Sequence, residues 1–171
     1  ETALDATHTS PFATRHPVHY RTVWSGIPAR MREMDFGQTN CINLLTEAFD
    51  KIDAHRDIVL YANSQGTATV LNWMSDSANL ARIRGRVRLV VLEAVMASGN
   101  TAIWHTIHSM IIPSSIRYII ECLKLDALVP VLVSMFVFRA YEPLSPQPLK
   151  RAENFPRNIP VVIVHSRGDR Q

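Results

Sequence analysis

The pattern of hydrophobic and polar positions predicts regular secondary structure from Gln38 onward. Between Gln38 and His55, charged residues alternate with apolar residues that recur at helical spacing, namely Ile42, Leu44, Leu45, Ala48, Phe49 and Ile52. Thr39 or Asn40 can cap the start of this segment. The spacing therefore predicts an amphipathic helix over residues 38–55.

Three short apolar runs have the composition of buried parallel strands. They are rich in β-branched residues, show no alternation and are followed by turn residues. The runs cover residues 58–62, 87–94 and 159–165. We therefore expect three strands that are covered on both faces.

The segments between these strands are predicted to be mostly helical. A second helix is expected from Gly66 to Met74, followed by a linker that holds Asp76, Ser77 and Asn79. Four arginines then alternate around Gly85, and a solvated loop before the strand is a simpler interpretation of them than a patch for a polyanion: Arg82, Arg84, Arg86 and Arg88. Residues 98–141 are predicted to form helices broken at Pro113 and Pro130, and residues 143–160 an irregular connection.

Parallel strands joined by helical crossovers indicate an α/β fold, with a three-layer αβα arrangement and a mostly parallel sheet. Residues 1–36 are expected to be irregular, with at most one short strand near residues 18–23. Residues 37–171 then form a single domain, and the helices near 98–150 are an insertion between strands. In such sheets, functional groups gather beyond the C-terminal ends of the strands.

Composition narrows the possible functions. The chain has 171 residues, 47% hydrophobic and 19% charged, with a formal net charge of +3, which suits a globular domain and argues against nucleic acid as a partner. Two cysteines without metal-ligand spacing make neither a disulfide framework nor a metal site, and a reducing compartment is favoured. The longest apolar stretch, residues 127–138, is too short to cross a bilayer, which needs about 20 residues. Without a signal peptide in the chain, a cytoplasmic location is favoured.

A candidate nucleophile follows the first predicted strand. The sequence there is Tyr61-Ala62-Asn63-Ser64-Gln65-Gly66. A reactive serine needs a tight strand-to-helix turn, usually with φ above zero, and small residues two positions before and two after it. Ala62 and Gly66 meet that need, and the Gln65 N–H can help to hold an oxyanion at the helix N-terminus. The alternative is a serine that only caps the following helix.

The segment from Ile58 to Met74 resembles the nucleophile turn of the α/β-hydrolase family, including its strand and its following helix. The family pattern is Gly-x-Ser-x-Gly, and Ala62 stands here in place of the first glycine. The resemblance implies that Ser64 attacks an acyl carbonyl and that the Gln65 N–H is one oxyanion donor. It covers residues 36–171, the middle and late part of a hydrolase domain.

Asp169 is the candidate acid, because it follows the third predicted strand. In the α/β-hydrolase family, an acidic residue follows a late strand and orients the catalytic histidine. The alternative is an aspartate that caps the turn. Glu93 is a weaker candidate, since it stands before its own strand ends and is expected to make an internal polar contact.

The histidine of the triad is not found at the expected place, because no histidine follows Asp169. His165 is expected to be a buried ring within its strand, and His105 with His108 is a remote metal-pair alternative. A glycine-containing oxyanion loop is also not recognised before Ser64. We therefore expect an incomplete hydrolase domain that is nearly inactive by itself.

These features lead to one main functional hypothesis. The chain is expected to be part of a serine hydrolase that needs no cofactor and acts on an ester or other small acyl substrate, as esterases, lipases or peptidases do. The helices near 98–150 would form its cap or lid. A non-catalytic binding protein of the same fold is the alternative, and contact of residues 127–138 with a membrane surface is a fainter one.

Overall fold

The computed structural model describes residues 34–165, except for residues 84, 111–112, 126–127 and 146. The predicted strand at residues 18–23 and the turn at 166–169 lie outside these residues. In the part described, the elements are α1 Thr39–Asp50, β1 Ile58–Asn63, α2 Gln65–Met74, α3 Ser77–Ile83, β2 Val87–Glu93, α4 Gly99–Met110, α5 Ser114–Cys122, α6 Leu128–Phe136, α7 Pro148–Arg151, the 3₁₀ helix η2 Ala152–Asn154, and β3 Val161–Val164.

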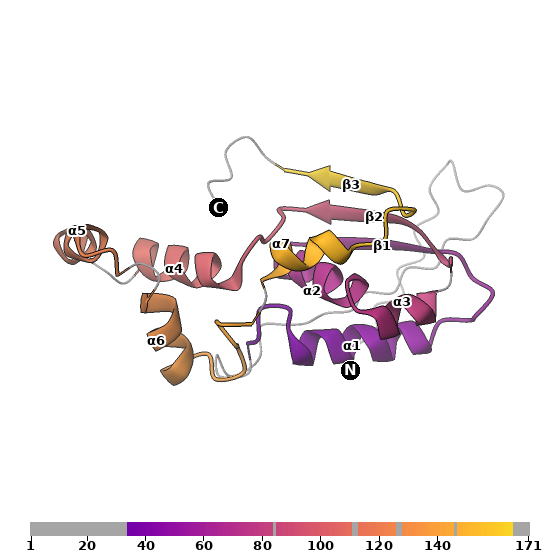
Figure 1. Ribbon diagram of the computed structural model, residues 1–171, viewed down its shortest axis with the longest axis horizontal. Helices are drawn as coiled ribbons and strands as arrows, with labels where there is room; N and C mark the ends of the chain where they lie inside the picture. The colour runs from indigo at the N-terminus through magenta and orange to yellow at the C-terminus, as the bar shows by residue number, and fades with distance from the viewer. Residues whose placement is uncertain (1–33, 84, 111–112, 126–127, 146, 166–171) are drawn as a thin grey trace.

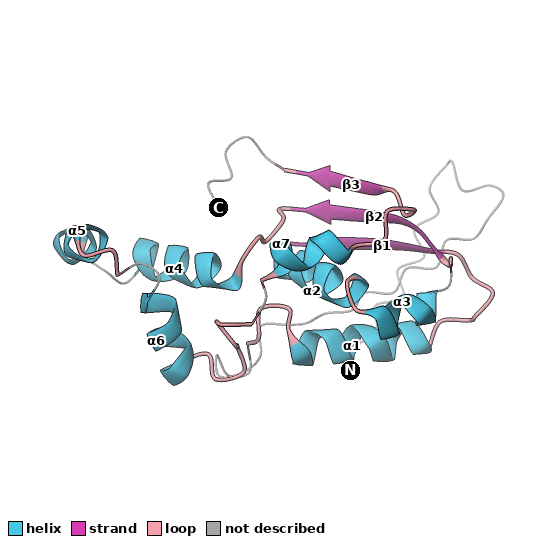
Figure 2. Ribbon diagram, in the orientation of Figure 1, coloured by secondary structure: helices cyan, strands magenta, loops and turns pink. Residues whose placement is uncertain are grey.

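The three strands form one parallel sheet in the order β1-β2-β3 (Figure 2). Asn63 pairs with Glu93, and Glu93 pairs with Val164, so all three strands end at the same edge. We refer to this edge as the C-terminal edge. The predicted α/β class and the parallel sheet are confirmed.

Helices α1, α2, α3 and α7 lie on one face of the sheet (Figure 1). Helix α2 is the centre of this layer, and every residue from Thr67 to Met74 is buried. Trp73 and Met74 are fully buried, and they belong to a core that includes Phe49 of α1 and Val90 of β2. This continuous burial follows because α2 packs on β1, on α1 and on α7 at the same time.

The opposite face of the sheet is not covered by any described helix, so the prediction of strands buried on both faces is wrong. Val59 and Tyr61 are 60% and 64% exposed, and all four residues of β3 are exposed. Apolar runs without alternation are typical of strands with two covered faces. Here the described helices cover one face only.

The predicted linker after α2 is a helix, α3. Arg82 and Arg88 are exposed to solvent, as expected, but they lie in α3 and β2 and not in a loop. Arg82 forms an ion pair with Asp50 of α1, and Arg88 forms one with Asp57. Arg86 donates to the carbonyl oxygens of Ile52 and Asp53 and lies over the Phe49 ring. These contacts hold the segments at the N-terminal edge of the sheet, and their partners are too distant in sequence for a local pattern to reveal.

The start of α1 is capped differently from the prediction. Its first residue is Thr39, and its N-cap residue Gln38 makes no capping bond through its side chain. Instead, the buried Asp35 carboxylate accepts the N–H groups of Gly37, Asn40 and Cys41. A carboxylate at a helix N-terminus is favoured by the free N–H groups and by the helix dipole.

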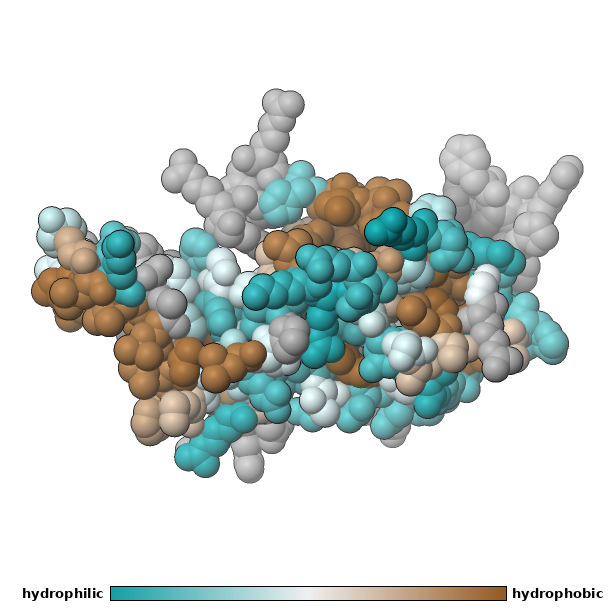
Figure 3. All heavy atoms as spheres, viewed as in Figure 1, coloured by the Kyte–Doolittle hydropathy of each residue, from teal (hydrophilic) through white to brown (hydrophobic). Residues whose placement is uncertain are grey.

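Helices α4, α5 and α6 extend away from the sheet, and we call them the helical arm (Figure 1). Pro113 is the N-cap of α5, so the predicted helix break at this proline is confirmed. Pro130 does not break a helix: it lies in the first turn of α6, where a backbone N–H has no intrahelical acceptor and its loss is tolerated. Many apolar side chains of the arm are exposed (Figure 3), among them Ile116, Tyr118, Ile119, Leu123, Leu128, Leu132, Met135 and Phe136. No described helix is both long and apolar enough to span a membrane.

The base of the arm is fixed to the rest of the molecule by a second core cluster and by amide groups. Phe36, Ala68, Met96, Ile103 and Tyr141 form the buried part of this cluster. The Gln38 amide pairs with the backbone of Glu142, donating to its carbonyl oxygen at 2.9 Å and accepting its N–H at 2.7 Å. The arm is therefore joined to the start of α1 and to the first half of α2.

Candidate active site

Ser64 lies in a one-residue turn between β1 and α2, at the C-terminal edge of the sheet. Its φ is 49° and its ψ is −118°, a sparsely populated region for a residue other than glycine. The positive φ predicted from the sequence is confirmed. Ser64 is the N-cap residue of α2, and its side chain makes no capping hydrogen bond, so the hydroxyl itself does not cap the helix.

The two small residues that flank the turn face one another. A Cβ atom added to Gly66 would lie 3.7 Å from the Cβ of Ala62, which is ordinary van der Waals contact. Ala62 is buried beneath the turn. An alanine would therefore fit at Gly66, but larger side chains at either position would separate the strand from the helix.

Backbone hydrogen bonds hold both sides of the turn. The Ser64 N–H donates to the Glu93 carbonyl oxygen at 3.0 Å, which continues the pairing of β1 with β2. The Ser64 carbonyl oxygen accepts the Thr67 N–H at 2.9 Å and the Thr67 hydroxyl at 2.6 Å. Consequently, the strained backbone of Ser64 is anchored to a strand on one side and to a helix on the other.

Gln65 is the first residue of α2, and its backbone N–H belongs to the helix turn that lacks intrahelical acceptors. Its side-chain amide donates to the Cys41 sulfur of α1 at 3.5 Å. Burial, followed by the hydrogen bond and charge of Asp35, raises the pKa of the Cys41 thiol to about 11. Cys41 is therefore a neutral packing group beside the turn and not a second nucleophile.

Asp169, the predicted acid, lies outside the described residues. The strand before it is described, and β3 ends at Val164, paired with Glu93, which in turn pairs with Asn63. The chain thus leaves β3 at the same edge as Ser64, although β3 is shorter than the strand predicted over residues 159–165.

Glu93 makes a polar contact, but this contact is exposed and not internal as predicted. The Tyr61 hydroxyl of β1 donates to the Glu93 carboxylate across the open face of the sheet. The hydrogen bonds from Tyr61 and then Asn63 lower the pKa of Glu93, while the bond to Glu93 raises the pKa of Tyr61. The carboxylate is thus stabilised in its ionised form by groups of the neighbouring strand.

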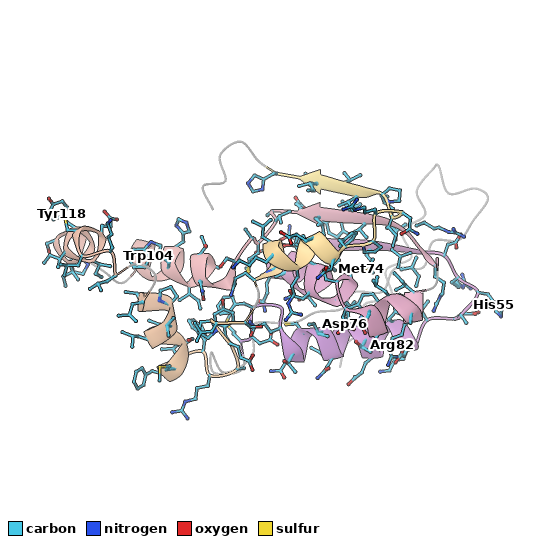
Figure 4. The ribbon with its side chains drawn as sticks, in the orientation of Figure 1. His55, Met74, Asp76, Arg82, Trp104 and Tyr118 are labelled. Atoms are coloured by element: carbon cyan, nitrogen blue, oxygen red, sulfur yellow. The ribbon has the colours of Figure 1, made fainter. Side chains whose placement is uncertain are left out.

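The described histidines make no hydrogen bond to Ser64. His165 follows β3 directly and is exposed, so the expectation of a buried ring within the strand is wrong. His55 precedes β1, at the end of the molecule opposite to Tyr118 (Figure 4). His105 is exposed on α4. Within the described ranges, no three His, Cys, Asp or Glu side chains gather as metal ligands would.

Two features of this edge were not predicted. Ala94, directly after β2, also has a positive φ of 50°, so the strained Ser64 has a strained neighbour on the adjacent strand. Thr67 is fully buried and carries hydrogen bonds on both sides of its hydroxyl. A polar residue three positions after the serine is a signal in the sequence, but its partner, Met96, is visible only in the structure.

Comparisons with protein-family models, curated proteins and solved structures find no match for this chain.

Proposed function

We propose that the protein is a serine hydrolase of the α/β-hydrolase type, in which Ser64 attacks the carbonyl carbon of an ester or another acyl substrate. The observation that carries the proposal is the backbone of Ser64, with φ 49° and ψ −118° between a parallel strand and a helix. Strain of this kind at a serine is typical of nucleophile turns. The hydroxyl is not engaged in capping the helix, which leaves it available for reaction.

The other groups of the reaction follow from their places in the fold. As the carbonyl oxygen gains negative charge, the Gln65 N–H donates to it, with support from the dipole of α2. Asp169 serves as the acid that orients a histidine base, and it follows a strand that ends at the same edge as Ser64. None of the histidines that the structure describes is assigned the role of this base.

The helical arm is the cap of the enzyme in this proposal. It joins the sheet through Met96 and Ala68, close to the start of α2, and it carries exposed apolar side chains such as Tyr118 and Phe136. Such a surface suits a substrate with an apolar acyl group.

The proposal is tested by labelling the intact protein, in a form that contains the histidine base, with a fluorophosphonate probe, which reacts with activated serines. We expect one labelled site, which Ser64→Ala abolishes. Ser77→Ala is the matched control, because Ser77 is an exposed serine at the start of an ordinary helix, and labelling should be unchanged. Labelling that survives Ser64→Ala, or no labelling of the folded protein, contradicts the proposal.

A non-catalytic binding protein is the second candidate. The exposed apolar residues of α5 and α6 favour it, because contiguous apolar surface is typical of interaction sites. Under this alternative the folded protein is not labelled, while the backbone of Ser64 keeps its strained geometry. The same experiment therefore separates the two candidates.

A further inference from the structure

Thr67 occupies a position from which it can control the geometry of the turn. It is fully buried in the first turn of α2. Its hydroxyl donates to the Ser64 carbonyl oxygen at 2.6 Å and accepts the Met96 N–H at 2.9 Å. Because a hydroxyl has a single hydrogen, the bond from Met96 leaves that hydrogen to Ser64.

The two dihedral angles of Ser64 are held by different contacts. The bond from the Ser64 N–H to Glu93 fixes the peptide plane before the serine, and therefore its φ. The bonds from Thr67 fix the peptide plane after it, and therefore its ψ. Without these partners, a serine would relax to a more populated region.

The plane held by Thr67 is the one that carries the oxyanion donor. The Ser64 carbonyl and the Gln65 N–H belong to one planar trans peptide, in which they point in opposite directions. Since Thr67 holds the carbonyl oxygen within the helix turn, the Gln65 N–H must point out of it. Thr67 thus sets the orientation of the Gln65 N–H by holding the carbonyl oxygen at the other end of the same peptide plane.

Met96 connects this arrangement to the base of the helical arm. It belongs to the buried cluster with Phe36, Ile103 and Tyr141. It lies two residues after Ala94, whose positive φ redirects the chain from β2. Three groups then form a continuous chain of hydrogen bonds: the Met96 N–H, the Thr67 hydroxyl and the Ser64 carbonyl.

We infer that Thr67 is a positioning residue, which aims the Gln65 N–H at the oxyanion through the Ser64–Gln65 peptide plane. The inference rests on the proposed hydrolase function for its chemical consequence, and on the hydrogen bonds alone for its geometry. The methyl group of Thr67 has no part in it, so a hydroxyl at this position should suffice.

The test compares four forms of the full-length protein: wild type, Thr67→Val, Thr67→Ser and Thr69→Val. Thr69 is the matched control because it is a buried threonine of the same helix whose hydroxyl donates to the Gln65 carbonyl oxygen, at 3.4 Å, and not to Ser64. The measurements are the maximal rate of fluorophosphonate labelling, the probe concentration at half that rate, and the urea midpoint of unfolding.

We expect Thr67→Val to lower the maximal rate by about tenfold or more, since a misdirected oxyanion donor acts as a partial loss of that donor. The half-saturating probe concentration should stay unchanged, Thr67→Ser should restore the rate, and Thr69→Val should keep it. A purely structural role would instead make the rate follow the unfolding midpoint in all variants. Equal losses in Thr67→Val and Thr69→Val, or a normal rate in folded Thr67→Val, would overturn the inference.

Two further measurements keep the geometry and the chemistry separate. If Thr67→Val does not fold, Thr67→Cys carries a weaker donor and should give an intermediate rate; a wild-type rate in that variant would count against the inference. If the wild type is not labelled at all, the proposed function fails, and a crystal structure of the Thr67 variant still decides the geometry. A Ser64 ψ that stays near −118° in that structure would show that Thr67 does not hold the plane.

Discussion

The layered part of the molecule consists of the sheet and helices α1, α2, α3 and α7. Its helix-covered side buries its apolar residues, whereas the helical arm leaves many of its own exposed. In the layered part, Trp73 and Met74 are fully buried between the sheet and two helices, and the Trp73 indole N–H donates to Thr46 at 2.9 Å. In the arm, Tyr118 and Phe136 are 69% and 70% exposed. The comparison shows that a high apolar content makes a core only where a second layer is present to cover it.

Replacement of one aromatic side chain in each region should give the largest contrast. Trp73→Ala should lower the free energy of unfolding by about 3–5 kcal/mol, because it empties the centre of the core. Phe136→Ala should change it by no more than about 0.5 kcal/mol, since its ring is exposed. Urea unfolding measures both values, and a large loss for Phe136→Ala would mean that the arm is covered in solution.

Alanine substitutions at Gly37 and Gly99 compare how tightly the layered part and the base of the arm are packed. A Cβ at Gly37 would lie 2.6 Å from the Thr69 backbone nitrogen, at a φ of +87°. A Cβ at Gly99, at the base of the arm, would lie 2.7 Å from the Tyr141 ring. Gly37→Ala should cost about 3 kcal/mol, because backbone cannot move aside and the φ adds strain. Gly99→Ala should cost less, about 1–2 kcal/mol, because it meets side-chain atoms only and has no positive φ to add strain.

Thermal unfolding of both glycine variants measures this difference. Gly85→Ala is the control for strain alone, since Gly85 has a φ of +77° but no atom within 4 Å of an added Cβ. If Gly85→Ala lowered the melting temperature as much as Gly37→Ala did, packing against α2 would not be the main cause.

The two cysteines give the comparison with the smallest expected effect, a difference in how readily each thiol is modified. At pH 8, iodoacetamide should modify Cys122 of the arm and spare Cys41, which is buried and has a pKa of about 11. Mass spectrometry of the modified peptides measures the difference. Because the folded pKa lies above the ordinary value of 9.0, the thiol stabilises the fold below pH 9, and this contribution is lost as the pH rises through 11. Rapid modification of Cys41 in the native protein would show that the start of α1 opens readily.

Local pattern alone was sufficient for the alternation of helices and strands and for the turn at Ser64. Small residues at 62 and 66, an apolar run before them and a helical pattern after them all act within the same few residues. The α/β class could be predicted for the same reason, because each helix and each strand has its own pattern within a short stretch of sequence. The serine as nucleophile, its acid and the hydrolase activity stay predictions.

Other features depended on contacts between distant parts of the chain, and only the tertiary structure decided them. Asp35 caps α1, the arginines before β2 tie neighbouring segments together, and the uncovered face of the sheet leaves Val59 and Tyr61 exposed. The Met96 N–H lies 29 residues from the Thr67 hydroxyl that accepts it. Burial and hydrogen bonding depend on which surfaces meet in three dimensions, and a linear pattern of polarity does not contain that information.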